Sequence, residues 1–165
     1  MTLIGRSRAR FVAFAVLPAM AVVLGAAAGV LQWQIVSNRE TASAVGDSVQ
    51  AARNTAARIL SYQADTVEQD LTAARDHLTG PFLDSYTELV NTAVIPAARE
   101  RQISAVAEVV AAASVSATPE HAVALLFINQ ITTVGRDAPT PIPSTVRVTL
   151  DKVDGRWLVS GFDPV

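Results

Sequence analysis

The chain has 165 residues, of which 50% are hydrophobic, with 13 basic and 15 acidic side chains and a formal net charge of −2. Arg6, Arg8 and Arg10 stand at its start; without them 10 basic and 15 acidic side chains remain, a net charge of −5 that excludes the basic surface needed to bind nucleic acid. Cysteine is absent, so no disulfide can hold a domain together, and a core of buried side chains must do so.

The first element expected is a membrane-spanning helix. Residues 11–31 carry no charge, and a helix of these 21 residues would be about 31 Å long, close to the ~30 Å hydrocarbon core of a bilayer. We predict a cytoplasmic basic segment over residues 1–10, a transmembrane helix over 11–33, a juxtamembrane connection over 34–44 and an extracytoplasmic domain over 45–165. Basic flanks stay in the cytoplasm, so we expect a single-pass protein of the cell membrane with its N-terminus inside.

Two small-residue patterns lie within this span. Ala26 and Ala28 form an Ala-x-Ala pattern that would suit cleavage of an export leader after Ala28. A leader has a shorter apolar region of about 7–15 residues, so the length of the run favours a permanent anchor. Gly25 and Gly29 are spaced as in helices that pair closely within membranes, although both residue types are common in such spans.

Three helices are expected next. Residues 41–62 carry one apolar stripe at helical spacing, and residues 65–78 carry a second. A third helix is expected over residues 81–94 and is ended by Pro96, because a proline ring interrupts a helix. Its predicted buried side chains are Phe82, Tyr86, Leu89 and Val90.

Four strands are expected after the helices. Residues 102–116 alternate, with the odd-numbered apolar positions facing inward throughout, and residues 122–133 are apolar on both faces, as a central strand would be. The three prolines of residues 134–144 predict a loop, because proline cannot donate to a strand ladder. Residues 145–153 alternate again and form the next strand.

A hairpin is expected at the end of this strand. Asp154-Gly155 favours a two-residue type I′ turn, in which both central residues take positive φ. Residues 156–162 then form the last strand and pair with the preceding one. The predicted pairs are Val153 with Arg156, Lys152 with Trp157 and Leu150 with Val159.

The two faces of this hairpin carry different apolar residues. One face carries Leu150, Trp157 and Val159. If it points inward, strand alternation turns the other face outward, where an exposed apolar cluster would mark a contact site. That cluster comprises Val153, Leu158 and Phe162. In the opposite arrangement the helices cover the cluster, and the register alone does not choose between the two.

Helices followed by strands predict a single α+β domain, with the helices packed on one face of a curved antiparallel sheet. A cone-shaped sheet wrapped around helices is the NTF2-like arrangement, and the order of the expected elements agrees with it. The expected architecture is therefore one N-terminal transmembrane helix followed by an NTF2-like domain.

Several segments resemble the Mce-associated membrane proteins of mycobacteria and related actinobacteria, which are encoded beside the mammalian-cell-entry (Mce) lipid importers. The most distinctive are "LTGPFLDSY" (78–86), "LLFINQ" (125–130) and "VDGRWLVS" (153–160), and the resemblance covers nearly the whole chain. It implies an NTF2-like exterior domain and a non-catalytic accessory subunit that docks on and stabilises an Mce-type lipid importer from the periplasmic side. The implied partners are the proteins of that importer complex and the membrane.

No pattern typical of a catalytic, cofactor-binding or metal site accompanies these segments. His77 and His121 are isolated in the sequence, whereas a metal site needs three or four ligands. Tyr62, Asp65 and Asp70 could line the mouth of a cone, but no nucleophile stands with a base. We therefore expect a protein that is not an enzyme and that has neither cofactor nor metal.

One function from another class stays open, an extracytoplasmic module that binds a lipid or sterol inside the cone. Small residues along two of the predicted strands would leave room for such a ligand, or would instead let the helices pack closely on the sheet. These residues are Ala105, Ala107, Ala111, Ala122 and Ala124.

Overall fold

The computed structural model describes residues 41–165, and Thr41–Val165 form one compact unit. The predicted basic segment, the transmembrane helix and the small-residue patterns around Gly25 and Gly29 lie outside the described residues. Within the described part of the chain, no helix is both long enough and apolar enough to cross a membrane. Residues 41–44, predicted as the end of the connection, are helical.

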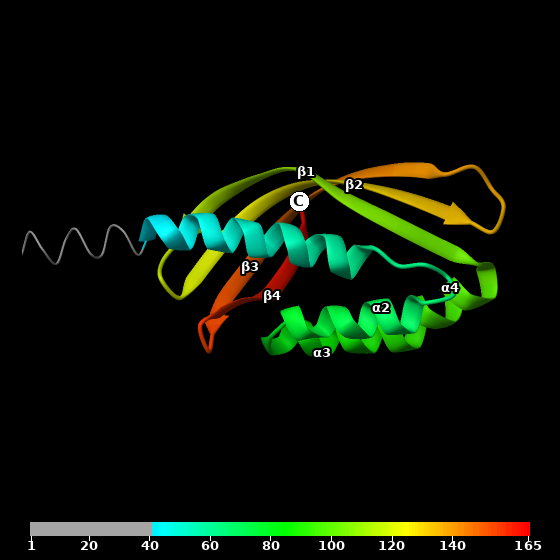
Figure 1. Cartoon of the computed structure of the whole chain (residues 1–165), viewed down its shortest axis with the longest axis horizontal. Helices are drawn as coiled ribbons and strands as arrows, with labels where there is room; N and C mark the ends of the chain where they lie inside the picture. The colour runs from blue at the N-terminus through cyan, green and yellow to red at the C-terminus, as the bar shows by residue number, and fades with distance from the viewer. Residues whose placement is uncertain (1–40) are drawn as a thin grey trace, which may run out of the picture. The chain divides into compact units, whose positions relative to one another are not determined.

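Helices come first along the chain and strands follow, as Figure 1 shows. A helix covers residues 41–60. It is followed by α2 (Val67–Ala74), the short 3-10 turn η1 (Arg75–His77), α3 (Gly80–Leu89), the π-helical turn η2 (Val90–Val94) and α4 (Ile95–Arg101). The strands are β1 (Ile103–Ala117), β2 (His121–Val134), β3 (Thr140–Val153) and β4 (Arg156–Pro164).

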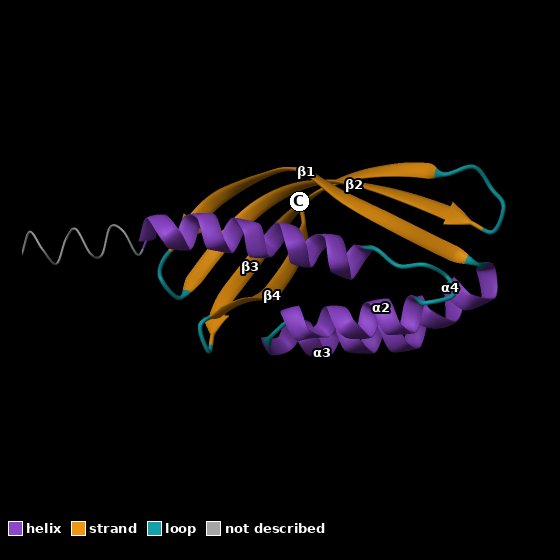
Figure 2. Ribbon diagram, in the orientation of Figure 1, coloured by secondary structure: helices purple, strands orange, loops and turns teal. Residues whose placement is uncertain are grey.

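The strands form one four-stranded antiparallel sheet in the order β1-β2-β3-β4. Figure 2 shows this sheet curving around the helices, with the helix over residues 41–60 lying across it and α2 and α3 running together below. The predicted α+β class, with helices packed on a curved antiparallel sheet, is confirmed. The prediction that the second strand lies inside the sheet is also confirmed, since β2 has β1 on one side and β3 on the other.

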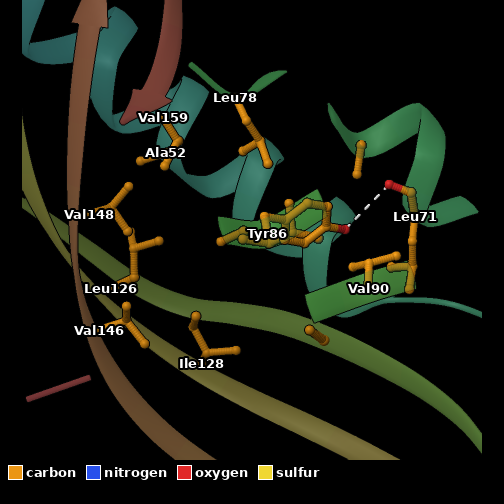
Figure 3. Packing of buried hydrophobic residues seen from close by; sticks show 14 of the residues in the cluster. Ala52, Leu71, Leu78, Tyr86, Val90, Leu126, Ile128, Val146, Val148 and Val159 are labelled. Atoms are coloured by element: carbon orange, nitrogen blue, oxygen red, sulfur yellow. Dashed lines mark hydrogen bonds between the residues drawn. The ribbon is translucent and has the colours of Figure 1, made fainter. Parts of the chain in front are cut away.

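The hydrophobic core lies between the helices and the inward face of the sheet (Figure 3). Val148 of β3 and Ala52 of the first helix are completely buried. Tyr86 of α3 lies between α2 and the sheet, and its hydroxyl donates a hydrogen bond of 3.4 Å to the Leu71 carbonyl. Each fully buried aliphatic side chain stabilises the fold by roughly 1.5–3 kcal/mol, so this layer holds the domain together without a disulfide.

The small residues of β1 and β2 serve close packing. Four of the five alanines considered above are buried against the helices, namely Ala105, Ala107, Ala122 and Ala124. The fifth, Ala111, is exposed. The space that small side chains leave on the inward face is therefore taken by the helices.

The third helix does not end at Pro96, contrary to the prediction. α3 passes through the π-helical turn η2 into α4, and the helical segment ends where Gln102 takes a left-handed conformation with φ of 53°. Pro96 lies in the first turn of α4, directly after the wider π turn, where its missing N–H is not required. Leu89 is exposed rather than buried, whereas Tyr86 and Val90 are buried as expected.

The residues of β1 that face the core are odd-numbered at the start of the strand and even-numbered after a β-bulge. Ala105 and Ala107 face the core, but the register with β2 shifts between Val109 and Ala111, so that one extra residue bulges out. Beyond this β-bulge Ala111 is exposed and Ala112 packs against the core. The predicted alternation therefore holds only for the first half of β1. The bulge moves the side chains that follow it to the other face, and a second register shift, between Ser114 and Ser116, changes the parity again.

The second part of the proline-rich segment predicted as a loop, residues 140–144, belongs to β3, whereas residues 135–139 form the loop. Pro141 pairs with Ile131 and Pro143 with Asn129 of β2. The Thr145 carbonyl accepts a hydrogen bond from the Val165 N–H at 3.0 Å, so the backbone groups of the odd-numbered residues here point away from β2. β4 ends opposite Val146, and the ring nitrogens of both prolines therefore face an open edge where no donor is needed.

The type I′ hairpin between β3 and β4 is confirmed. Asp154 and Gly155 have φ of 50° and 78°. All three predicted pairs are present, namely Val153 with Arg156, Lys152 with Trp157 and Leu150 with Val159. Leu150 and Val159 are buried, which fixes this face of the hairpin as the inward one.

Candidate docking surface

The apolar cluster predicted on the outward face of the hairpin is only partly outward. Phe162 faces the core instead, because its ring stacks on Phe82 of α3 with 6.1 Å between ring centroids. The cause is a bulge in β4: Leu150 pairs with Val159 but Thr149 with Gly161, so alternation reverses before Phe162.

The other two members of the predicted cluster lie on the solvent side of the hairpin. Val153 is exposed, and Leu158 is half-buried opposite Asp151. Their contact with a partner stays a prediction. Trp157 packs partly on the core, and the Lys152 ammonium lies 5.5 Å from the centre of its ring.

A different apolar surface lies on the outward face of the sheet, across β1 and β2. We call it the outer patch and define it by Val106, Val110, Phe127 and Ile131, whose side chains are between 44% and 59% exposed. Val106 lies directly opposite Ile131 in the ladder, and Phe127 pairs beside the bulge at Val110. Clustered exposed apolar side chains of this kind commonly mark a binding surface.

A shallow groove of about 590 Å³ runs along the outer patch towards the C-terminal residue. Its lining includes Val110, Phe127, Asn129, Pro143, Thr145 and Val165. The groove exists because the bulge lifts Val110 out of the strand while the two prolines keep the β3 edge free of a further strand. Its lining combines apolar side chains with the amide residue Asn129 and the hydroxyl residues Ser144 and Thr145.

The outer patch had a signal in the sequence. Residues 122–133 are apolar on both faces, which led to the prediction of a central strand. The helices cover one face only, so the other apolar face, with Phe127 and Ile131, is left to solvent. The apolar residues of the outward face were therefore visible in the sequence, but the sequence did not show which face the helices cover.

The groove on the helical side is polar. It lies between the helix over residues 41–60 and α2, has a volume of about 610 Å³, and is lined by Asn54, Arg58, Ser61, Gln69 and Asp70 among others. The Asp70 carboxylate accepts hydrogen bonds from the Thr66 hydroxyl at 2.7 Å and the Gln63 N–H at 3.2 Å. These bonds engage it in the local turn, which is a structural role.

The other two residues considered for a cone mouth lie elsewhere. Asp65 lines a separate, smaller cleft with Glu68 and Arg99. Tyr62 pairs through its backbone with Ala105 at the edge of β1, and burial raises the pKa of its phenol. The three residues do not converge on one site.

The two histidines lie in different environments. His121 and Asp151 face each other across β2 and β3, with 2.6 Å between Nδ1 and Oδ1, and both side chains are about half exposed. Hydrogen bonds from Ser160 and His121 lower the pKa of the Asp151 carboxyl.

His77 ends η1 beside the hairpin, where the Arg156 guanidinium donates to the Asp76 carbonyl at 3.0 Å. Partial burial lowers the pKa of the His77 imidazole, and the cations Arg58 and Arg156 lower it further, against the opposing effect of Asp76. Among the described residues, no side-chain hydrogen bond joins either imidazole to a hydroxyl. Among residues 41–165 there is also no group of three or more His, Cys, Asp or Glu side chains that could hold a metal ion.

Comparison with known proteins gives close relatives in one species. No protein-family model matches the chain. The outer membrane proteins Rv1973 and MT2024.1, from two strains of Mycobacterium tuberculosis, are each 52% identical over 159 residues, which cover 96% of this chain and 99% of the relative. The uncharacterized protein Rv1362c of the same species is 43% identical over 120 residues, which cover 72% of this chain and 54% of that protein.

Solved structures share the fold at low sequence identity. The periplasmic domain of DotI superimposes with a TM-score of 0.61 at 14% identity, covering 71% of this chain and 91% of that domain. Agrobacterium tumefaciens VirB8 gives a TM-score of 0.56 at 17% identity, covering 70% of this chain and 88% of VirB8. An IcmL-like type IV secretion system protein of Legionella pneumophila gives 0.61 at 10% identity, covering 71% and 88%. At these identities the likeness concerns the fold alone, an α+β fold of the NTF2-like kind with a four-stranded antiparallel sheet.

Proposed function

The chain belongs to the family of the Mycobacterium tuberculosis outer membrane protein Rv1973, and from this we propose that it is a non-catalytic accessory subunit of the cell envelope. Its domain lies outside the cytoplasmic membrane, held there by the N-terminal anchor, and docks on a larger membrane complex. The relatives' printed name and the periplasmic origin of the DotI domain support this location. The acidic character of the domain is compatible with it.

The observation that carries the proposal is the outer patch. The inward face of the sheet is covered by helices, whereas Phe127 and Ile131 remain exposed on the outward face of a central strand. An apolar surface of this kind gains roughly 25 cal/mol for each Å² of apolar area that a partner removes from water. Phe127 would be the main anchor, because buried aromatic side chains dominate the binding energy of many interfaces.

The partner we propose is an Mce-type lipid importer, which the domain stabilises by binding one of its exterior subunits. The support is the resemblance of three segments, 78–86, 125–130 and 153–160, to Mce-associated membrane proteins. One of these segments, 125–130, contains Phe127 of the outer patch.

The alternative of a lipid bound inside the cone has less support. The inward face that such a ligand would need is filled by packed side chains: Leu126, Val148 and Leu150 are completely buried against the helices. A ligand there would have to displace these helices from the sheet. Docking requires no such rearrangement, since the outer patch is already accessible.

The test is recovery of the importer from native membranes with the intact chain as bait. Phe127→Asp should reduce the recovered importer proteins at least about tenfold, because a carboxylate placed in an apolar interface costs more than 1.4 kcal/mol. Leu89→Asp is the matched control, since Leu89 is also an exposed apolar residue (57% against 44% for Phe127), lies on α3, and should leave recovery unchanged. Equal recovery with both variants would contradict the proposed docking surface.

A further inference from the structure

The outer edge of β1 is occupied along its first half. The Ala105 N–H donates to the Tyr62 carbonyl at 2.9 Å, and the Tyr62 N–H donates to the Ala105 carbonyl at 2.8 Å. The Ala107 N–H donates to Ser61 Oγ at 2.9 Å, and the Val109 carbonyl accepts a bond of 3.3 Å from Arg53. Tyr62 thus pairs with this edge as a one-residue strand, and the side chains of Ser61 and Arg53 cover the next positions.

The second half of the same edge is open. Because Ala105, Ala107 and Val109 direct their backbone groups outward, the residues between them face β2. Past the bulge the register places Ala111 and Ala113 opposite Phe127 and Leu125.

β2 directs the backbone groups of its odd-numbered residues to β1, so Ala111 and Ala113 bond to β2, and Ala112 and Ser114 face away. In the described residues, no backbone or side-chain group bonds to the N–H or C=O of Ala112 or Ser114.

This open stretch is a short regular segment between two β-bulges, at the register shifts Val109/Ala111 and Ser114/Ser116. Residues 111–117 contain no charged residue and no proline. The opposite side of the sheet differs from this stretch. The free end of β3 carries Pro141 and Pro143. β4 is covered where the Thr79 N–H donates a hydrogen bond to the Val159 carbonyl at 2.9 Å. The open part of β1 thus offers backbone donors and acceptors that no group of the described domain uses.

We infer that this edge pairs with the same edge of a second copy of the chain, antiparallel about a twofold axis at Ala113. Such an axis places Ala112 opposite Ser114 of the second copy, and both residues direct their backbone groups to the edge. About four backbone hydrogen bonds form, two for each such pair, with the two Ala113 residues facing each other at a Cα separation of about 4.5 Å. The four-stranded sheet of each copy continues into that of the other.

Charge and size favour a second copy as the occupant. A twofold axis at Ala113 opposes only alanine and serine side chains within residues 112–114, and residues 111–117 of either copy contain no charge. No like charges therefore meet across the new ladder. The axis is perpendicular to the sheet, so the outer patches of both copies lie on one common face.

The test uses the absence of native cysteine. Ala113→Cys in the full chain, oxidised in native membranes, should give a disulfide-linked dimer, because a Cα separation of about 4.5 Å lies within disulfide range. Val106→Cys is the matched control: it is exposed on the same strand and the same face, but in the half that residues 61–62 cover, and it should stay monomeric. Failure of Ala113→Cys to cross-link, or equal cross-linking by Val106→Cys, would overturn the inference.

A second variant separates pairing from folding. Ala112→Pro removes an N–H that no group of the described domain uses, so the fold should persist with a melting temperature within about 2 °C of the parent. In the Ala113→Cys background it should lower the cross-linked fraction about tenfold, since each copy loses a donor to the other. An unchanged cross-linked fraction would show that Ala113 meets its counterpart by another route, and the strand pairing would be wrong.

Discussion

At the scale of single residues, the turn between β3 and β4 depends on one glycine. Gly155 has φ of 78°, and an added Cβ would meet no atom within 4 Å, so any cost of a side chain there comes from the backbone and not from a clash. β-Branched residues disfavour positive φ most strongly. The hairpin that the sequence predicted therefore offers a clean test of that prediction.

Gly155→Val should lower the free energy of unfolding by about 1–3 kcal/mol, measured by urea denaturation of the domain over residues 41–165. Gly46→Ala is the control, because Gly46 lies in a helix with open space around it and should gain up to about 1 kcal/mol. A Gly155→Val domain as stable as its parent would mean that the turn is not type I′.

His77 provides a prediction on pH. Its pKa is lowered by burial, by Arg58 and by Arg156, so folding favours the neutral imidazole. A group with a lowered folded-state pKa of this kind stabilises the fold above its unfolded pKa of about 6.5, and the stabilisation is lost as the pH falls below that value.

The His77 ring should therefore titrate below pH ~6.5 in an NMR titration, and Arg58→Gln should raise its pKa by removing one cation. His77→Gln should reduce the loss of stability between about pH 7 and pH 5. A His77 pKa above the ordinary value would contradict this account of its surroundings.

At the scale of elements, the sequence predicted the features that depend on residues close together in the chain and missed those that depend on a neighbouring strand. Apolar stripes located the helices, and Asp154-Gly155 located the hairpin, because both depend on residues close in sequence. The bulge at Val110 could not be read from the chain, since it is defined by the strand that lies opposite. The strand character of Pro141 and Pro143 depends on where β4 ends, which is likewise a tertiary fact.

Part of the candidate site could be predicted from the sequence. Val106, Val110, Phe127 and Ile131 could be recognised as apolar residues of two strands, but which face the helices cover follows from packing. The bulge in β4 similarly decides the orientation of Phe162, which alternation alone assigns to the wrong face.

Substitutions at two hairpin residues, Phe162 and Val153, should have different effects on stability. Phe162→Asp should destabilise the domain by at least about 2 kcal/mol, because it removes the stack on Phe82 and puts a charge against the core. Val153→Asp should change stability by no more than about 0.5 kcal/mol, since Val153 is exposed. Thermal unfolding of both variants measures the difference, and equal stabilities would mean that Phe162 does not face the helices.

At the scale of the whole molecule, the helices and the sheet have different roles. The helices fill the inward face and use small residues to come close, which gives the domain a core without disulfides. An antiparallel sheet can leave its other face in contact with water, and here that face carries the outer patch. The surface on this side of the sheet is a shallow one with exposed apolar side chains.

The central claim is that the outer patch contacts an importer protein in the envelope. Its most direct test is photo-cross-linking in intact cells, with a benzophenone amino acid in place of Phe127 and, as a control, in place of Leu89. The account predicts a covalent adduct between the position-127 chain and an Mce-type importer protein, and no such adduct from position 89. An importer adduct that forms from position 89 and not from position 127 would contradict it.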